Sequence, residues 1–142
     1  MWLFGKPQAT LPIRLTHLVE QSATGNLKTD IDIRGIYRAL SPALENEVLR
    51  IAQEALANTV RHSRASRVAL DLRYHPNELM LTVSDNGIGF QAGDTTLSAK
   101  GHFGLQGMRE RASQIGGTLK VESSPESGTT VTLRVPLSNG KE

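Results

Sequence analysis

The segment Asp85-Asn86-Gly87-Ile88-Gly89-Phe90 combines an acid with two closely spaced glycines. It follows residues 78–84, whose alternating pattern predicts a strand, so Asp85 lies at a rigid strand end. A carboxylate held there can accept a hydrogen bond from a buried group. Glycine adopts backbone angles that other residues avoid, and it lets a ligand approach the main chain closely. We call residues 85–90 the first glycine segment and interpret it as a ligand-facing turn.

An Asn-Gly pair between apolar runs is also a signal for a β-hairpin. A hairpin would need a second alternating strand directly after the turn. Residues 91–96 instead read Gln-Ala-Gly-Asp-Thr-Thr, which is polar and typical of a loop. The sequence therefore favours the ligand-facing turn, and we expect residues 91–100 to form a flap.

A second glycine segment, residues 101–107, reads Gly-His-Phe-Gly-Leu-Gln-Gly and leads into a predicted helix. Exposed amides at a helix start bind anions, helped by the helix dipole. Spaced glycines alone would equally suit a flexible loop with helix-capping residues. Upstream, however, Glu54 and Asn58 are neighbours on one face of another predicted helix. Together these features predict one ligand site. The acid of Asp85 would bind a base ring, the amides at the helix start would bind phosphates, and the side-chain oxygen of Asn58 would bind a hard cation.

The surrounding patterns predict the elements that must position these residues. Ser41-Pro42 is typical of a helix start, and apolar residues recur at helical spacing from Leu44 to Val60, so we expect a helix to about residue 62. Thr10 similarly predicts a cap for an earlier helix. The fold class is therefore α+β, a two-layer sandwich with about three helices on one face of a mixed, mostly antiparallel five-stranded sheet. The expected helices cover residues 10–24, 41–62 and 105–115, and the expected strands cover residues 29–33, 68–74, 78–84, 119–123 and 131–135. One domain, residues 10–137, would have short tails at 1–9 and 138–142.

Composition and missing motifs exclude several classes. The 142-residue chain has no cysteine, so disulfide partners and thiol catalysis are excluded. Its net charge of +2 and aromatic fraction of 4% argue against a nucleic-acid partner. A Walker loop, a dinucleotide fingerprint and a Gly-x-Ser-x-Gly elbow are absent, and the four histidines lack paired metal-ligand spacing.

Four segments in order resemble a known family. Residues 50–62 resemble the N box of the gyrase, chaperone, histidine kinase and mismatch-repair ATPases, the GHKL or Bergerat-fold superfamily. The first glycine segment and residues 104–111 resemble its two glycine boxes, and Gly128-Thr129-Thr130 resembles its terminal glycine-threonine element. The similarity extends over residues 43–136. Within the superfamily, the sequences of these four motifs most resemble those of bacterial sensor histidine kinases of the nitrate-sensor and lipid-fluidity-sensor subfamily.

The resemblance implies that the chain binds ATP and Mg²⁺ and assigns roles at both ends of the nucleotide. Asp85 would accept a hydrogen bond from the adenine amino group, supported through water by Thr129. Asn58 would give an oxygen to Mg²⁺, and Glu54 would be the general base. Arg61 stands where lysine is frequent, and His62 matches a recurrent histidine that either packs or contacts the ligand. The rest of the expected binding set is Gly87, Ile88 and Gly89 around adenine, Gly101, Gly104, Leu105 and Gly107 over the phosphates, and Thr130.

The implied function is the ATP-binding catalytic domain of a two-component sensor histidine kinase, which phosphorylates a histidine and signals to a response regulator. The expected acceptor, a histidine followed by an acid, is missing, because His17 precedes Leu18. The acceptor would therefore lie on a separate dimerisation domain, and we expect this chain alone to be monomeric and cytoplasmic, as part of an inner-membrane sensor. The alternatives are an anti-sigma-factor-type serine kinase and a non-catalytic nucleotide-binding regulatory module.

Overall fold

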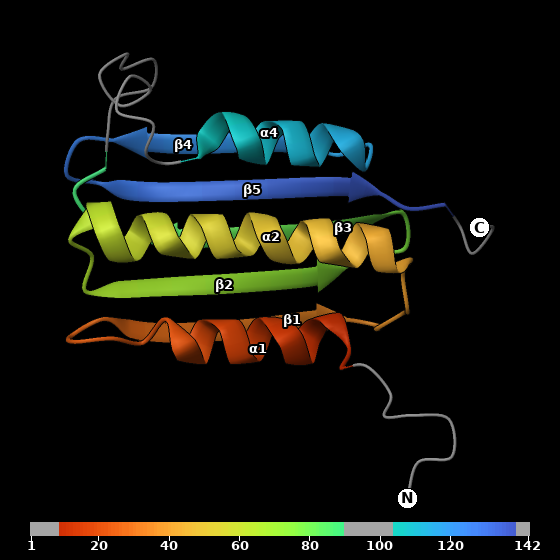
Figure 1. The fold of residues 1–142 in the computed structure, drawn as a ribbon, viewed down its shortest axis with the longest axis horizontal. Coiled ribbons are helices and arrows are strands. Elements are labelled where there is room, and N and C mark those ends of the chain that lie inside the picture. Colours follow the sequence, from red (N-terminus) through yellow and green to blue (C-terminus); the bar gives the residue numbers. More distant parts are fainter. Residues whose placement is uncertain (1–8, 90–103, 139–142) are drawn as a thin grey trace, which may run out of the picture.

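The fold consists of a mixed sheet with helices on one of its faces (Figure 1). The structure is a computed structural model that describes residues 9–89 and 104–138. Its strands have the spatial order β1-β2-β3-β5-β4, in which β1 is parallel to β2 and the other neighbours are antiparallel. The predicted two-layer fold is thus confirmed. The elements are α1 (Leu11–Gln21), β1 (Lys28–Gly35), α2 (Pro42–Asn58), the π-helix η1 (Thr59–Ser63), β2 (Arg67–Tyr74), β3 (Glu78–Asp85), α4 (Leu105–Gln114), β4 (Thr118–Ser124) and β5 (Gly128–Pro136).

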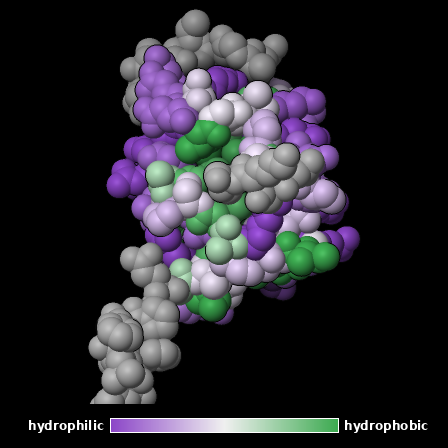
Figure 2. Space-filling view, turned by 90° about the vertical axis from the view of Figure 1, so that its right-hand side faces the viewer, coloured by the Kyte–Doolittle hydropathy of each residue, from purple (hydrophilic) through white to green (hydrophobic). Residues whose placement is uncertain are grey.

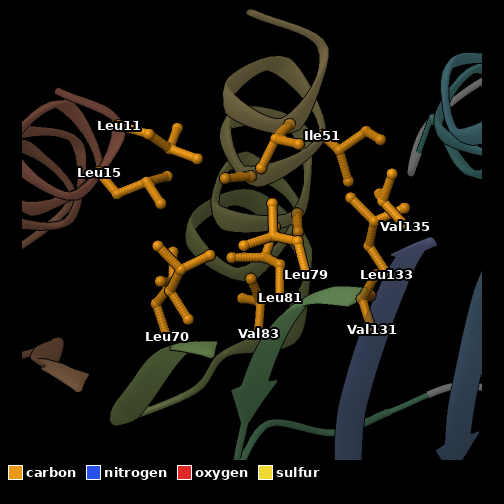
Figure 3. Packing of buried hydrophobic residues seen from close by; sticks show 14 of the residues in the cluster. Leu11, Leu15, Ile51, Leu70, Leu79, Leu81, Val83, Val131, Leu133 and Val135 are labelled. Atoms are coloured by element: carbon orange, nitrogen blue, oxygen red, sulfur yellow. The ribbon is translucent and has the colours of Figure 1, made fainter. Parts of the chain in front are cut away.

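Alternation along the strands divides the sheet into an apolar and a polar face. Leu70, Leu81 and Leu133 point toward the helices and are at most 2% exposed. They meet Leu11 and Leu15 from α1 and Ile51 from α2 in a single core between the layers (Figure 3). Viewed from the end at which α2 begins, hydrophobic residues show in the middle of the molecule between hydrophilic outer surfaces (Figure 2).

The other face of the sheet carries charged side chains in pairs. Arg34 pairs with Asp32, Arg73 with Asp71 and Arg134 with Glu78, at nitrogen–oxygen distances of 2.7, 3.1 and 3.1 Å. Such solvated pairs contribute little to stability, so the helix-facing core dominates the energetics. No helix in the described residues has the length and apolar character needed to cross a membrane.

The helix starts agree only partly with the sequence predictions. Ser41 caps α2 as predicted, because its hydroxyl oxygen accepts a hydrogen bond from the Leu44 amide at 3.2 Å. The Thr10 side chain makes no capping hydrogen bond at α1, although α1 begins where it was predicted. Proline in the first turn is the signal that remains valid there, because its missing amide costs nothing at that position.

The end of α2 differs from the prediction of a continuous helix to about residue 62. The α-helix stops at Asn58 and continues as the π-helix η1 over Thr59–Ser63. A π-turn is wider than an α-turn and shifts the residues that follow around the axis. Val60, which the sequence placed on the apolar stripe, is therefore 46% exposed.

Candidate functional site

The segments that were predicted from the sequence to form the ligand site lie at one end of the molecule (left in Figure 1). Here β3 ends, β5 begins, α2 gives way to η1, and α4 begins. Asp85, the last residue of β3, lies opposite Thr129 of β5 in the antiparallel register. The predicted acid, the helix face and the glycine-threonine element are thus brought together by the fold.

The carboxylate of Asp85 is held from two sides. Its Oδ2 accepts a hydrogen bond from the Thr59 hydroxyl at 3.0 Å. Its Oδ1 accepts a hydrogen bond from the Gly87 amide at 2.9 Å. Both donors fix the carboxylate plane, because each oxygen has its own partner. Asp85 is therefore a preorganised acceptor at the rim of the sheet.

Asn86 anchors the turn after β3 to the start of β2. Its Oδ1 accepts hydrogen bonds from the amides of Ser66 and Arg67, both at 3.0 Å, and its Nδ2 donates to the Ser66 hydroxyl at 2.9 Å. Strand β3 pairs with β2 and β5, and the chain continues as a loop through Gly89. The Asn-Gly pair therefore does not connect a hairpin, in agreement with the sequence interpretation.

The turn between β4 and β5 packs backbone to backbone on the first glycine segment. At Gly89 (φ +66°) an ideal Cβ would lie 2.1 Å from the Ser124 carbonyl oxygen. At Gly128 (φ +87°) it would lie 2.1 Å from the Asp85 carbonyl oxygen. Because both neighbours are main chain, neither position has room for a side chain. Ile88, between the two glycines, is 47% exposed and presents an apolar surface beside this tight packing.

The two threonines of the glycine-threonine element point in opposite directions. Thr129 shares a hydrogen bond with the Ser123 hydroxyl at 2.8 Å, in the register position opposite Asp85. Thr130 shares one with the Ser84 hydroxyl at 3.3 Å, and alternation places this pair on the polar face of the sheet. The structure thus brings Thr129 toward Asp85 but does not bring Thr130 there.

Helix α2 contributes Glu54 and Asn58 to the same end. Both are half-buried, and Glu54 lies directly against Gly104, the residue that precedes α4. Leu105 packs against the core, whereas Gly107 is exposed and has nothing within 4 Å of an ideal Cβ. Arg61 lies exposed on η1. Gly101, the His62 side chain and the predicted flap lie outside the described residues.

Thr59 is a site residue that the sequence analysis missed. It is 3% exposed and lies within the predicted helix over residues 41–62, where the sequence indicated only that apolar residues recur at helical spacing. The available signal was a hydroxyl-bearing residue among aliphatic ones, directly after Asn58. The sequence does not reveal which residue is the partner of that hydroxyl, because Asp85 contacts it only through the packing of α2 on β3.

We expect Thr59→Val to lower the free energy of unfolding by about 1–3 kcal/mol, because it removes a buried donor from a carboxylate while keeping the side-chain volume. Chemical denaturation at neutral pH measures this change. Thr59→Ser is the matched control, since it keeps the hydroxyl, and it should lose less. A valine variant as stable as the unaltered chain would show that this hydrogen bond contributes nothing.

A family model described as histidine kinase-, DNA gyrase B- and HSP90-like ATPase matches residues 43–139, which include every residue of this site. Helix α1 and strand β1 precede the matched residues. The chain belongs to this ATPase family.

Named relatives of this ATPase-family chain are sensor proteins. VraS of Staphylococcus saprophyticus is 39% identical over 94 residues, which is 66% of this chain and 26% of VraS. The sensor histidine kinase LiaS of Bacillus subtilis is 42% identical over 99 residues, which is 70% of this chain and 27% of LiaS. The match therefore spans about a quarter of the length of these relatives.

Solved structures share the fold of this ATPase-family chain. The ATP-binding domain of PrrB from Mycobacterium tuberculosis has a TM-score of 0.69 at 22% identity, covering 92% of this chain and 96% of that one. A histidine kinase domain from Erythrobacter litoralis EL346 also has a TM-score of 0.69, at 21% identity, covering 94% of this chain and 66% of that one. At these identities the likeness concerns the fold.

Proposed function

We propose that this chain is the ATP-binding catalytic domain of a two-component sensor histidine kinase. In this proposal it transfers the γ-phosphoryl group of ATP to a histidine on a separate helical dimerisation domain. Family membership and the names of the relatives support this function. The observation that carries it is the Asp85 carboxylate, oriented by Thr59 and Gly87 at the end of the fold that also holds Glu54 and the start of α4.

Asp85 is the proposed recognition element for adenine. A carboxylate has about four acceptor positions, of which Thr59 and Gly87 each use one. The remaining positions are available to the exocyclic amino group of adenine. The exposed side chain of Ile88 suits the face of a purine ring, and the Thr129–Ser123 hydroxyl pair would support a bridging water.

Asn58 and the start of α4 are the proposed binding elements for the phosphates and their cation. In the described ranges, 9–89 and 104–138, no three His, Cys, Asp or Glu side chains gather as a metal site. A cation here would thus take most ligands from phosphates and water, which Mg²⁺ accepts readily. Asn58 fits as a single amide-oxygen ligand, and bound Mg²⁺ would neutralise phosphate charge. The free amides at the start of α4 would face the phosphate oxygens.

Glu54 is the proposed general base. It would take the proton from the acceptor imidazole as the imidazole nitrogen attacks the γ-phosphorus. The bond from this phosphorus to the bridging oxygen breaks at the same time, and ADP leaves. The phosphohistidine then supplies the phosphoryl group to a response regulator. In a membrane sensor, the domain would act on the cytoplasmic side, where ATP is present.

Labelled ATP and a separate helical hairpin carrying a histidine followed by an acid test this function. We expect label on the hairpin in a bond that acid breaks and base does not, as for a phosphorylated histidine. An acid-stable label on a serine would instead favour the anti-sigma-factor-type kinase. Nucleotide binding measured by calorimetry without any transfer would favour the regulatory module.

A further inference from the structure

The contact between Gly104 and Glu54 joins the start of α4 to the side chain of the proposed base. Gly104 precedes α4 in the left-handed conformation, with φ 55° and ψ 23°. An ideal Cβ at this position would lie 2.6 Å from both Cγ and Cδ of Glu54, and 2.7 Å from its Oε2. These distances are well inside van der Waals contact. The half-buried carboxylate of Glu54 therefore occupies the space that a side chain at position 104 would need.

A second contact fixes where α4 lies along α2. Arg111 of α4 pairs with Glu47 of α2 at 3.0 Å between Nη1 and Oε1. Glu47 lies about two turns before Glu54, and Arg111 lies about two turns after Gly104. The two contacts are thus the two ends of one antiparallel helix pair, with the fully buried Met108 between them. Sliding or turning α4 would expose Met108 and separate both contacts, so the burial of Met108 keeps the first turn of α4 in register with Glu54.

We propose that Gly104 is a positioning residue for Glu54. The bare backbone of Gly104 is the surface on which the Glu54 side chain rests, so it limits the directions that the carboxylate can take. This inference rests on the proposed function, because the orientation of Glu54 matters for transfer only if Glu54 is the base. It gives Gly104 a second task beside binding phosphate, and the two tasks differ in what they change. A phosphate contact sets the affinity for ATP, whereas the position of a base sets the rate of transfer once ATP is bound.

Gly104→Asn is the most informative variant. Asparagine tolerates the left-handed conformation better than other residues with a Cβ, so the backbone should keep its course. The new Cβ would displace the Glu54 carboxylate. We expect the transfer rate at saturating ATP to fall by about 10- to 100-fold, since a displacement of about 1 Å can have that effect. The proposed phosphate contact of Gly104 uses its backbone amide, which asparagine keeps, so the dissociation constant for ATP, measured by calorimetry, should change by less than about threefold.

Gly116→Asn is the matched control at the other end of α4. Gly116 also has a positive φ, +73°, but nothing lies within 4 Å of an ideal Cβ. This variant has the same new side chain and a comparable backbone, so a similar shift in melting temperature is expected with an unchanged transfer rate. If both variants lost transfer equally, the cause would be general strain in α4, and the inference would be wrong.

Glu54→Asp combined with Gly104→Asn tests the contact itself. The shorter aspartate leaves space for the new Cβ, so Gly104→Asn should reduce transfer less in the Glu54→Asp background than in the original chain. Weaker ATP binding with an unchanged saturated rate would instead show that residue 104 acts only on the nucleotide. A Glu54→Gln variant with full transfer would overturn the base assignment and hence the proposed mechanism. If Glu54→Gln loses transfer while Gly104→Asn keeps it, only the present inference fails.

Discussion

Asp85→Asn should weaken ATP binding by about 1.5–3 kcal/mol, the usual contribution of a hydrogen bond to a charged group. In dissociation constant this is a rise of about 10- to 150-fold. The asparagine oxygen can still accept from one of the two donors, Thr59 or Gly87, that hold Asp85. Its NH₂ group then faces the other protein donor and the adenine amino group. All three groups are hydrogen-bond donors, so the hydrogen bond to adenine is lost. Isothermal calorimetry with a non-hydrolysable ATP analogue gives the change directly.

Two comparisons make the Asp85 result specific. Asp32→Asn removes an exposed carboxylate from the polar face of the sheet and should leave the affinity for ATP unchanged. Purine riboside triphosphate lacks the exocyclic amino group, so its affinity should fall much less than that of ATP when Asp85 is replaced. Equal losses of affinity for both nucleotides would mean that Asp85 supports the loop but does not bind the amino group of adenine. An unchanged ATP affinity would remove the adenine assignment altogether.

The layers of the fold follow from local patterns that the sequence displays directly. Burial alternates along β2 and β3, as the recurring apolar residues predict, and the turn His75-Pro76-Asn77 between them has the residues that turns require. The α2 start combines a capping serine with a proline, so both its position and its hydrogen bond were predictable. These signals are local, since each depends on residues within one element and the next.

Contacts between segments that are distant in the chain could not be predicted from the sequence. The Thr59–Asp85 hydrogen bond joins residues 26 positions apart, and neither residue type identifies the other. The Glu47–Arg111 pair is equally hidden, because many exposed Glu and Arg residues would suit it. The π-turn at Thr59 is a further case. The apolar spacing continues through Val60 as for an α-helix, and only the tertiary structure shows that the stripe ends earlier.

The glycines of the site differ in what they touch, and this difference divides the site into two halves. Gly89 and Gly128 lie against carbonyl oxygens of the main chain, so a side chain at either position would push apart the backbone around Asp85. Gly104 lies against the side chain of Glu54, so a side chain at position 104 would displace that carboxylate and not the main chain. Under the proposed function, a side chain at Gly89 or Gly128 would therefore disturb the backbone of the adenine pocket, whereas one at Gly104 would disturb the orientation of the base.

Glu54→Gln should lower the rate of transfer to a supplied histidine by about 100- to 10,000-fold, the usual contribution of a general base. Glutamine has nearly the same shape, so its contact with Gly104 should remain, but it cannot take the imidazole proton. ATP affinity should therefore change little. Single-turnover transfer at saturating ATP measures the rate, and calorimetry measures the affinity.

Glu20→Gln is the control for the loss of one negative charge, because Glu20 is exposed on α1, outside the matched residues 43–139. It should transfer at the original rate. A loss of the same size in Glu20→Gln would assign the effect of Glu54→Gln to the change of charge alone and would remove the base assignment.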